Sequence, residues 1–168
     1  MTELPTGRRD LMLAALLAAV AGNDAFAGPI DPTQTIVRLP EQIAWQTPQG
    51  FPARTVEMAP LFGGATAPGL YYVLVKWHPG YMSAPHTYVT DRLCVVVSGT
   101  WWVNSGADFD PGQTVPAPAG SFVHRVAHTP HYDGVRRHAT EPAVIAICGI
   151  GPVGQTWLEP DQPTVRRV

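Results

Sequence analysis

Apolar residues in this chain gather in short runs that are separated by glycine, proline, asparagine or aspartate. Five of these runs are dense in β-branched and aromatic residues, which is typical of strands. They cover residues 70–78, 92–99, 100–104, 121–126 and 143–151. After the N-terminal segment, no stretch shows the 3.6-residue period of an amphipathic helix. Many short strands at close spacing predict an all-β sandwich or a closed barrel.

The segments between the strands predict how the chain turns and where it divides. Gly99-Thr100 separates two strand-like runs and predicts a tight hairpin, whereas residues 106–120 predict a longer loop. Residues 28–68 are rich in Pro, Gly and Thr with short apolar patches such as 35–39 and 43–45, and predict an extended arm with one or two edge strands. The predicted organisation is a signal segment (1–27), an arm (28–68), a barrel (69–160) and a C-terminal tail (161–168).

The first 27 residues have the layout of an export signal. Arg8 and Arg9 precede the apolar run LMLAALLAAVAG, which is too short to span a bilayer. Ala25-Phe26-Ala27 places small residues at the −3 and −1 positions of a cleavage site. The paired arginines resemble a twin-arginine signal, with an ordinary secretory signal as the alternative. We therefore expect cleavage near Ala27 and a periplasmic or secreted protein.

Composition narrows the classes of function. Apolar residues make up 45% of the chain and charged residues 14%, with a formal net charge of −2, so no basic face for nucleic acid is expected. A Gly-rich phosphate loop and a G-x-S-x-G elbow are both absent from the sequence. Cys94 and Cys148 lie in apolar runs, which favours two small buried side chains over a disulfide.

Two histidine-containing segments carry the candidate chemistry. The first, residues 79–99, contains at fixed spacing Gly80, His86, Tyr88, Arg92 and Gly99. The second, VAHTPH, ends at His131. Alternate residues of a strand point to the same side, so positions 86, 88 and 92 are expected to face one interior. His131 is expected to reach the same point from a facing strand.

This spacing resembles that of the cupin superfamily over residues 70–158. The cupin motifs have histidine at the positions of His86, Tyr88 and His131 and glutamate at the position of Arg92, so Tyr88 and Arg92 depart from the pattern. The segments that resemble small single-domain RmlC-like cupins are Val96–Val103, Pro118–Phe122 and Gly149–Pro152. The resemblance implies a jelly-roll barrel, also called a double-stranded β-helix. It also implies a homodimer to which the N-terminal arm contributes, and no stable membrane insertion is expected.

The resemblance leaves two enzymatic hypotheses open. In the first, His86, Tyr88 and His131 hold a divalent transition metal, one of Fe, Mn, Ni, Cu or Zn, for oxygenase- or lyase-type chemistry. Arg92 then binds an anionic substrate, because its planar fork matches a carboxylate. In the second, no metal is present, and His86 and Tyr88 act as general base and acid on an anion held by Arg92, as in metal-free epimerases of the cupin type.

A third hypothesis is not catalytic. The barrel then binds a small ligand or only packs, and Arg92 pairs with Asp91 or Asp133 as a structural bridge. Two weaker candidates stay open. Cys148 is either a further soft metal ligand or a small buried side chain, and His128 and His124 lie either at the rim of the pocket or on the surface. Of the adjacent Trp101 and Trp102, one is expected to face inward.

Overall fold

The computed structural model describes residues 33–168, so the predicted export signal at residues 1–27 lies outside the described part and stays a prediction. The described chain divides after Gln42 into two units. The first contains exposed extended chain and the short 3-10 turn η1 (Pro40–Gln42). The second, from Ile43 onward, contains every strand. Within residues 33–168 no helix is long and apolar enough to cross a membrane.

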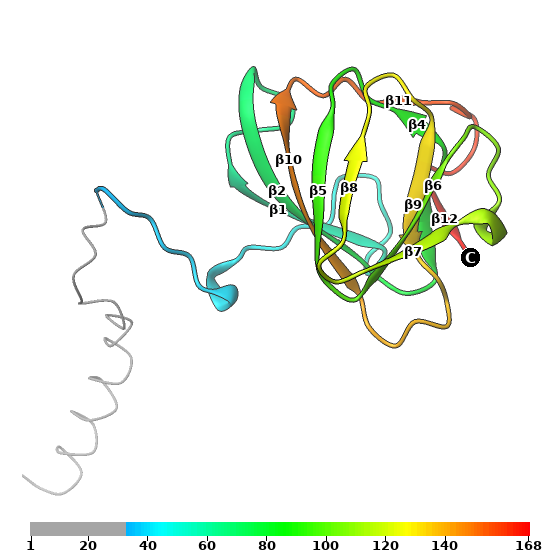
Figure 1. Cartoon of the computed structure of the whole chain (residues 1–168), viewed down its shortest axis with the longest axis horizontal. Helices are drawn as coiled ribbons and strands as arrows, with labels where there is room; N and C mark the ends of the chain where they lie inside the picture. Colours follow the sequence, from blue (N-terminus) through cyan, green and yellow to red (C-terminus); the bar gives the residue numbers. More distant parts are fainter. Residues whose placement is uncertain (1–32) are drawn as a thin grey trace, which may run out of the picture. The chain divides into compact units, whose positions relative to one another are not determined.

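One wall of the barrel is an antiparallel sheet of five strands (Figure 1). In spatial order they are β1 (Val56–Phe62), β2 (Gly69–Trp77), β10 (Ala143–Gly151), β5 (Arg92–Ser98) and β8 (Phe122–Arg125). Side chains along β2 alternate, with Val73, Val75 and Trp77 buried and Tyr72 exposed. This alternation is the period of two expected for a sheet with one face on the core.

The second wall consists of shorter strands. Its main order is β11 (Thr156–Trp157), β4 (His86–Thr87), β9 (His131–Val135), β3 (Tyr81–Ser83) and β12 (Val165–Arg167). Strand β6 (Thr100–Ser105) pairs with β9 and with β7 (Val115–Pro118), and the 3-10 turn η2 (Pro111–Gln113) leads into β7. The hydrophobic core lies between the two walls and includes Trp101, Val135 and Ile145. The all-β barrel predicted from the sequence is confirmed.

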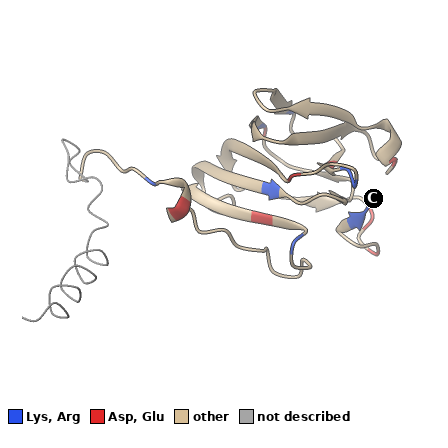
Figure 2. Cartoon of the chain, turned by 90° about the horizontal axis from the view of Figure 1, so that it is seen from below, with Lys and Arg blue, Asp and Glu red and all other residues tan. Residues whose placement is uncertain are grey.

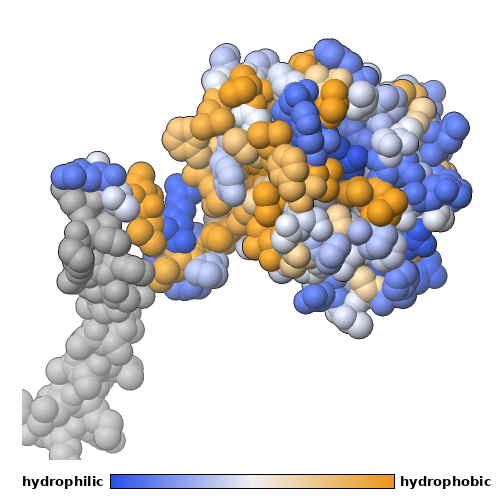
Figure 3. Space-filling view, viewed as in Figure 1, coloured by the Kyte–Doolittle hydropathy of each residue, from blue (hydrophilic) through white to orange (hydrophobic). Residues whose placement is uncertain are grey.

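The outer face of the five-stranded sheet is apolar. Eight large side chains on this face are between 38% and 63% exposed. We call them the outer apolar face: Phe62, Leu70, Tyr72, Leu93, Val95, Val97, Phe122 and Ile150. Figure 3 shows apolar side chains gathered over this part of the barrel, and Figure 2 shows few charged residues along its strands. A contiguous apolar surface of this kind is typical of an interaction site.

The predicted hairpin at Gly99 is wrong. β5 pairs with β10 and β8, whereas β6 pairs with β7 and β9, so the chain passes from one sheet to the other at Gly99. Gly99 has φ +70°, and a Cβ there would lie 3.0 Å from Ala143 Cα and would overlap the carbonyl of Pro142. Glycine is therefore required by a crossing between sheets, where left-handed backbone and close packing coincide.

Two predicted boundaries also need correction. β1 lies inside the predicted arm, so the barrel begins before residue 69, and β12 lies inside the predicted tail. β1 is an edge strand of the five-stranded sheet, as expected within residues 28–68, whereas the apolar patches at 35–39 and 43–45 form no strand. Instead, Gln46 makes an isolated bridge to Met58 of β1 and extends that edge of the sheet.

The five strands predicted from apolar runs are present as β2, β5, β6, β8 and β10. The pattern missed β7, where Pro116 and Pro118 interrupt the run, and β9, where polar residues alternate with others. Proline is tolerated in β7 because that strand has β6 as its single partner in the described chain.

Candidate active site

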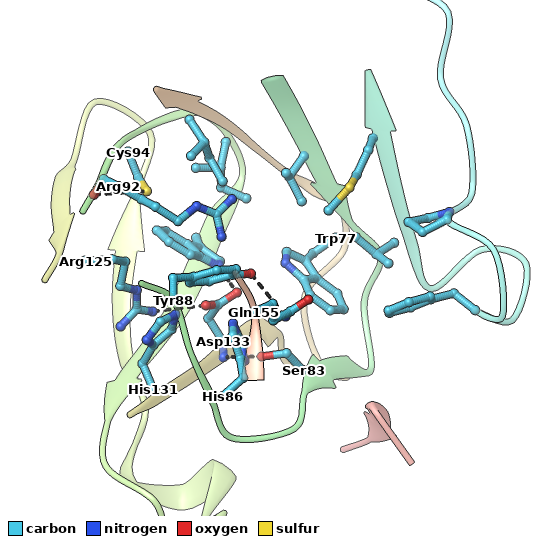
Figure 4. A pocket seen from close by; sticks show the side chains of 18 of the residues that line it. Trp77, Ser83, His86, Tyr88, Arg92, Cys94, Arg125, His131, Asp133 and Gln155 are labelled. Atoms are coloured by element: carbon cyan, nitrogen blue, oxygen red, sulfur yellow. Dashed lines mark hydrogen bonds and ion pairs between the residues drawn. The ribbon is translucent and has the colours of Figure 1, made fainter. Parts of the chain in front are cut away.

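A cavity of about 220 Å³ lies inside the barrel, between the two walls (Figure 4). Six of its ionisable or aromatic polar side chains come from both sheets and the loops that join them: His86, Tyr88, Arg92, Arg125, His131 and Asp133. The structure therefore brings together the four positions that the sequence singled out, His86, Tyr88, Arg92 and His131. Arg125 and Asp133 join them.

His86 and His131 are direct neighbours because β4 and β9 pair at these two residues. Directly opposite residues of antiparallel strands share a face, and the two ring centroids are 4.4 Å apart. Each ring Nδ1 contacts a backbone carbonyl two residues earlier, His86 at 2.8 Å to Ala84 and His131 at 3.0 Å to Thr129. A carbonyl only accepts, so each Nδ1 carries the proton and each Nε2 keeps a lone pair.

Both imidazoles are held in the neutral form. Burial lowers the pKa of His86, and the positive charge of Arg92 and Arg125 acts in the same direction. Burial also lowers the pKa of His131, together with the charge of Arg125 and a protonated His86. His131 Nε2 is buried and has no hydrogen-bond partner among the described residues. A buried acceptor without a partner indicates a position prepared for a ligand's proton or for an ion.

Tyr88 stands beside both histidines, with its ring centroid 5.0 Å from that of His86 and 5.5 Å from that of His131. Burial raises the pKa of Tyr88, although the charge of Arg92 opposes that effect. Gln155 Nε2 donates to the Tyr88 hydroxyl oxygen at 3.2 Å. The hydroxyl therefore accepts from Gln155 and retains its own proton to donate elsewhere.

Arg92 enters the cavity from the first residue of β5. Its Cζ lies 4.2 Å from the centre of the Tyr88 ring, and its Nε donates to Tyr71 Oη at 3.2 Å. No acidic side chain within residues 33–168 forms an ion pair with Arg92. The expected bridge to Asp91 or Asp133 is therefore wrong. A guanidinium without a carboxylate inside a cavity is suited to bind an anion.

The two aspartates have other partners. Asp91 is exposed and accepts from His124 Nε2 at 2.8 Å and from the backbone N–H of Ala127 at 2.7 Å. Asp133 is buried and accepts from Arg125 Nη2 at 3.1 Å. Its other carboxylate oxygen accepts from Trp101 Nε1 at 3.0 Å, so Trp101 is the inward member of the tryptophan pair. The Arg125–Asp133–Trp101 network was missed because its members come from three strands.

The weaker candidates lie outside the cavity. Cys148 follows Ile147 on β10, and since Ile145 and Ile147 line the cavity, Cys148 faces the other side of the sheet. Cys94 lines the cavity instead, and burial raises the pKa of its thiol to about 11, so it is protonated at neutral pH. His128 and His124 are exposed and do not line the cavity. Both cysteines are free.

The histidines and acidic side chains of the cavity are one ligand short of a resident transition-metal site. His86 and His131 each have an available Nε2, and a proton on Nδ1 shared with a carbonyl is the usual arrangement of a metal-ligating histidine. The third predicted ligand, Tyr88, has a raised pKa in the metal-free site because it is buried, and the fixed charge of Arg92 stands over its ring. In the described part of the chain, no group of three or more His, Cys, Asp or Glu side chains could hold an ion. The fit of a metal therefore depends on whether Tyr88 supplies the third ligand.

Comparison with known proteins gave matches in structure alone. No family model matches the chain, and no curated protein matches its sequence. The polyketide cyclase RemF from Streptomyces resistomycificus is 14% identical, with a TM-score of 0.57 over 80% of this chain and 86% of its own. The DMSP lyase DddQ from Ruegeria pomeroyi is 15% identical, with a TM-score of 0.57 over 91% and 97%.

A third similar structure is an RmlC-like cupin from Shewanella frigidimarina. It is 15% identical, with a TM-score of 0.51 over 69% of this chain and 90% of its own. A double-stranded β-helix protein from Klebsiella pneumoniae is 16% identical, with a TM-score of 0.53 over 73% and 96%. With its two antiparallel walls around one cavity, the chain has the cupin fold, as its sequence motifs predicted.

Proposed function

We propose that this protein is an enzyme that binds a small organic anion in the barrel and transfers a proton on it by acid–base chemistry. The observation that carries the proposal is the unpaired guanidinium of Arg92 beside two neutral imidazoles and a protonated phenol. Similar structures that carry the names of a polyketide cyclase and a DMSP lyase support chemistry on small molecules. The expected classes of reaction are isomerisation and lyase-type elimination.

In this mechanism Arg92 binds the carboxylate of the substrate through its Nη groups. His131 Nε2 accepts a proton from a carbon next to a carbonyl, and the electron pair of the broken C–H bond moves onto the carbonyl oxygen. The Tyr88 hydroxyl, which keeps its proton, donates to that oxygen. Return of the proton to a neighbouring carbon gives an isomer, and loss of a leaving group gives elimination.

The lowered pKa of His131 is compatible with a role as base. An imidazole that is neutral at physiological pH is ready to accept a proton, although a low pKa alone would make it a weak base. Besides burial, the charge of Arg125 lowers the pKa of His131, and a bound anion offsets that charge and so raises the proton affinity of His131 in the complex. The substrate thereby activates the base that acts on it.

A metal centre on His86, Tyr88 and His131 is the alternative proposal for oxygenase- or lyase-type chemistry. One observation favours it, the unpartnered Nε2 of His131. It requires Tyr88 to ionise beside the metal as the third ligand. A barrel that binds a ligand without catalysis is the remaining alternative.

The proposed function is tested by deuterium exchange at C3 of 2-oxobutanoate in D₂O, followed by NMR in the presence of EDTA. We expect exchange by the metal-free protein. His131→Asn should lower its kcat by about 10² to 10⁴-fold, the usual contribution of general base catalysis. Arg92→Gln should raise KM by about ten- to a hundredfold, because a charge-assisted hydrogen bond is lost.

Matched controls are His124→Asn and Arg137→Gln, since both side chains are exposed and lie outside the cavity. Exchange that EDTA abolishes and added Zn²⁺ or Fe²⁺ restores would establish the metal alternative. Saturable binding of 2-oxobutanoate without exchange in any state would establish the non-catalytic alternative. Equal loss in the exposed-site variants would contradict the assigned roles.

We also propose that two copies of the chain pair through the outer apolar face. A standard interface buries about 800 Å² per partner, on the order of what eight half-exposed large side chains provide. β1, which lies in the predicted arm, contributes Phe62 to this face. We expect a dimer by light scattering at micromolar concentration. Val95→Glu should give a monomer, whereas Val115→Glu on β7 should remain dimeric, and a monomeric wild type would refute the proposal.

A further inference from the structure

The cavity has one polar and one apolar end. The strands β1, β2 and β10 contribute only apolar side chains to it: Val56, Met58, Val75, Trp77, Ile145 and Ile147. The ionisable groups come from β4, β5, β8 and β9 and from the loop that carries Tyr88. In Figure 4, Trp77 lies across the cavity from Arg92, Arg125 and His131. The lining of the cavity therefore changes from apolar to polar along the five-stranded sheet, in the strand order β1-β2-β10-β5-β8.

The apolar end is closed by a turn upstream of the barrel. Pro48 and Phe51 line the cavity, and the Phe51 N–H donates to the Pro48 carbonyl at 3.1 Å. Phe51 also packs against the core. The bridge between Gln46 and Met58 fixes this turn to β1, with backbone hydrogen bonds of 2.8 and 2.9 Å. Phe51 is therefore a wall of the cavity on an anchored loop, at the end away from the charged groups.

The volume limits the size of the ligand. A space of about 220 Å³ holds about seven water molecules at roughly 30 Å³ each, or a ligand on the order of ten non-hydrogen atoms. A carboxylate at Arg92 uses three of these atoms. The remainder would meet the aromatic side chains of Trp77 and Phe51, where a flat apolar group gains most from burial.

We propose that the ligand is an amphipathic monocarboxylate, with its carboxylate at Arg92 and a single aromatic ring or branched alkyl group directed toward Phe51. Phe51 is then the residue that selects the length of this apolar group. This inference rests on the proposed function, because it uses Arg92 as the anion-binding residue. It adds the substrate class and a residue that determines specificity. A compact, uniformly polar anion such as oxalate leaves the apolar end empty and is expected to bind poorly.

Calorimetric titration of the full chain with acetate, phenylacetate and 3-phenylpropanoate tests the proposal. We expect phenylacetate to bind at least about tenfold more tightly than acetate, because its ring is buried. The neutral analogue 2-phenylacetamide should bind weakly, since it lacks the negatively charged carboxylate that Arg92 is proposed to bind. Phe51→Ala should weaken phenylacetate by about five- to tenfold, leave acetate unchanged, and improve 3-phenylpropanoate relative to phenylacetate.

Val115→Ala is the control, since Val115 is 62% exposed on β7 and lies outside both the cavity and the outer apolar face. It should leave all three affinities unchanged. Suppose that carboxylates bind to the wild type and that Arg92→Gln abolishes this binding. If phenylacetate then binds no more tightly than acetate, or if Phe51→Ala has no effect on phenylacetate, this inference alone is overturned. Absence of any carboxylate binding to the wild type overturns the proposed function and this inference together.

Discussion

Asp133→Ala is expected to lower the free energy of unfolding by about 3–5 kcal/mol, the cost of leaving a buried charge without its partner. Asp133 accepts from Trp101 Nε1 at 3.0 Å and from Arg125 Nη2 at 3.1 Å. The side chains of Arg125 and Asp133 are only 9% and 10% exposed, so water cannot replace the lost carboxylate freely. Arg125 Nε already lacks a partner in the described chain. Urea denaturation at neutral pH measures the change.

Two further variants separate the charge effect from lost packing. Arg125→Met combined with Asp133→Leu removes both charges, and should recover much of the stability that Asp133→Ala loses. Asp108→Ala is the control at an exposed aspartate and should change the free energy of unfolding by less than about 0.5 kcal/mol. A double variant no more stable than Asp133→Ala would show that the ion pair is not the cause.

Gly134→Ala is expected to destabilise the protein by about 3 kcal/mol or more, because the added methyl group has no free space. A Cβ at position 134 would lie 2.5 Å from Met82 Cα and 2.8 Å from Met82 Cγ, and would overlap the carbonyl oxygen of Tyr81. Two of these three atoms belong to the backbone of β3, which is paired with β9 at this point. The strands must therefore move apart, which also displaces His131.

Gly64→Ala is the matched control, since a Cβ there would meet only Ala67 Cβ at 3.7 Å. Its midpoint in thermal unfolding should stay near that of the wild type. If Gly134→Ala unfolded at the same temperature as Gly64→Ala, the close approach of β3 and β9 would be wrong.

The sequence predicted most of what depends on local pattern. Apolar runs identified β2, β5, β6, β8 and β10, because their inward positions are filled by core residues. β9 was missed because His131 and Asp133 occupy inward positions that core residues would otherwise fill. A strand that contributes two charged or polar residues to the site therefore lacks a clear strand signal, as expected where function overrides the apolar pattern.

The residues of the site were predicted better than the reason for their arrangement. His86, Tyr88 and Arg92 do line one cavity, but they do not alternate along one strand, because His86 lies on β4, Tyr88 in the following loop and Arg92 on β5 of the other sheet. The partner of Asp133 depends on which strands meet across the barrel, and the sequence gives no local sign that Arg125 is that partner. The same limitation explains why the hairpin predicted at Gly99-Thr100 is wrong. A Gly-Thr pair predicts a turn, but it does not determine whether the next strand pairs within the same sheet or in the other one.

The pairing of β12 with β3 has a consequence for how this protein folds. Residues 165–167 complete the sheet beside residues 81–83, and β3 in turn pairs with β9. The wall that holds both histidines thus gains its last strand only after the whole barrel sequence has been synthesised. Contacts between distant parts of a chain require closure of large loops and slow the search for the native state. Completion of this wall is therefore expected to be a late step of folding, on a timescale of roughly milliseconds to seconds.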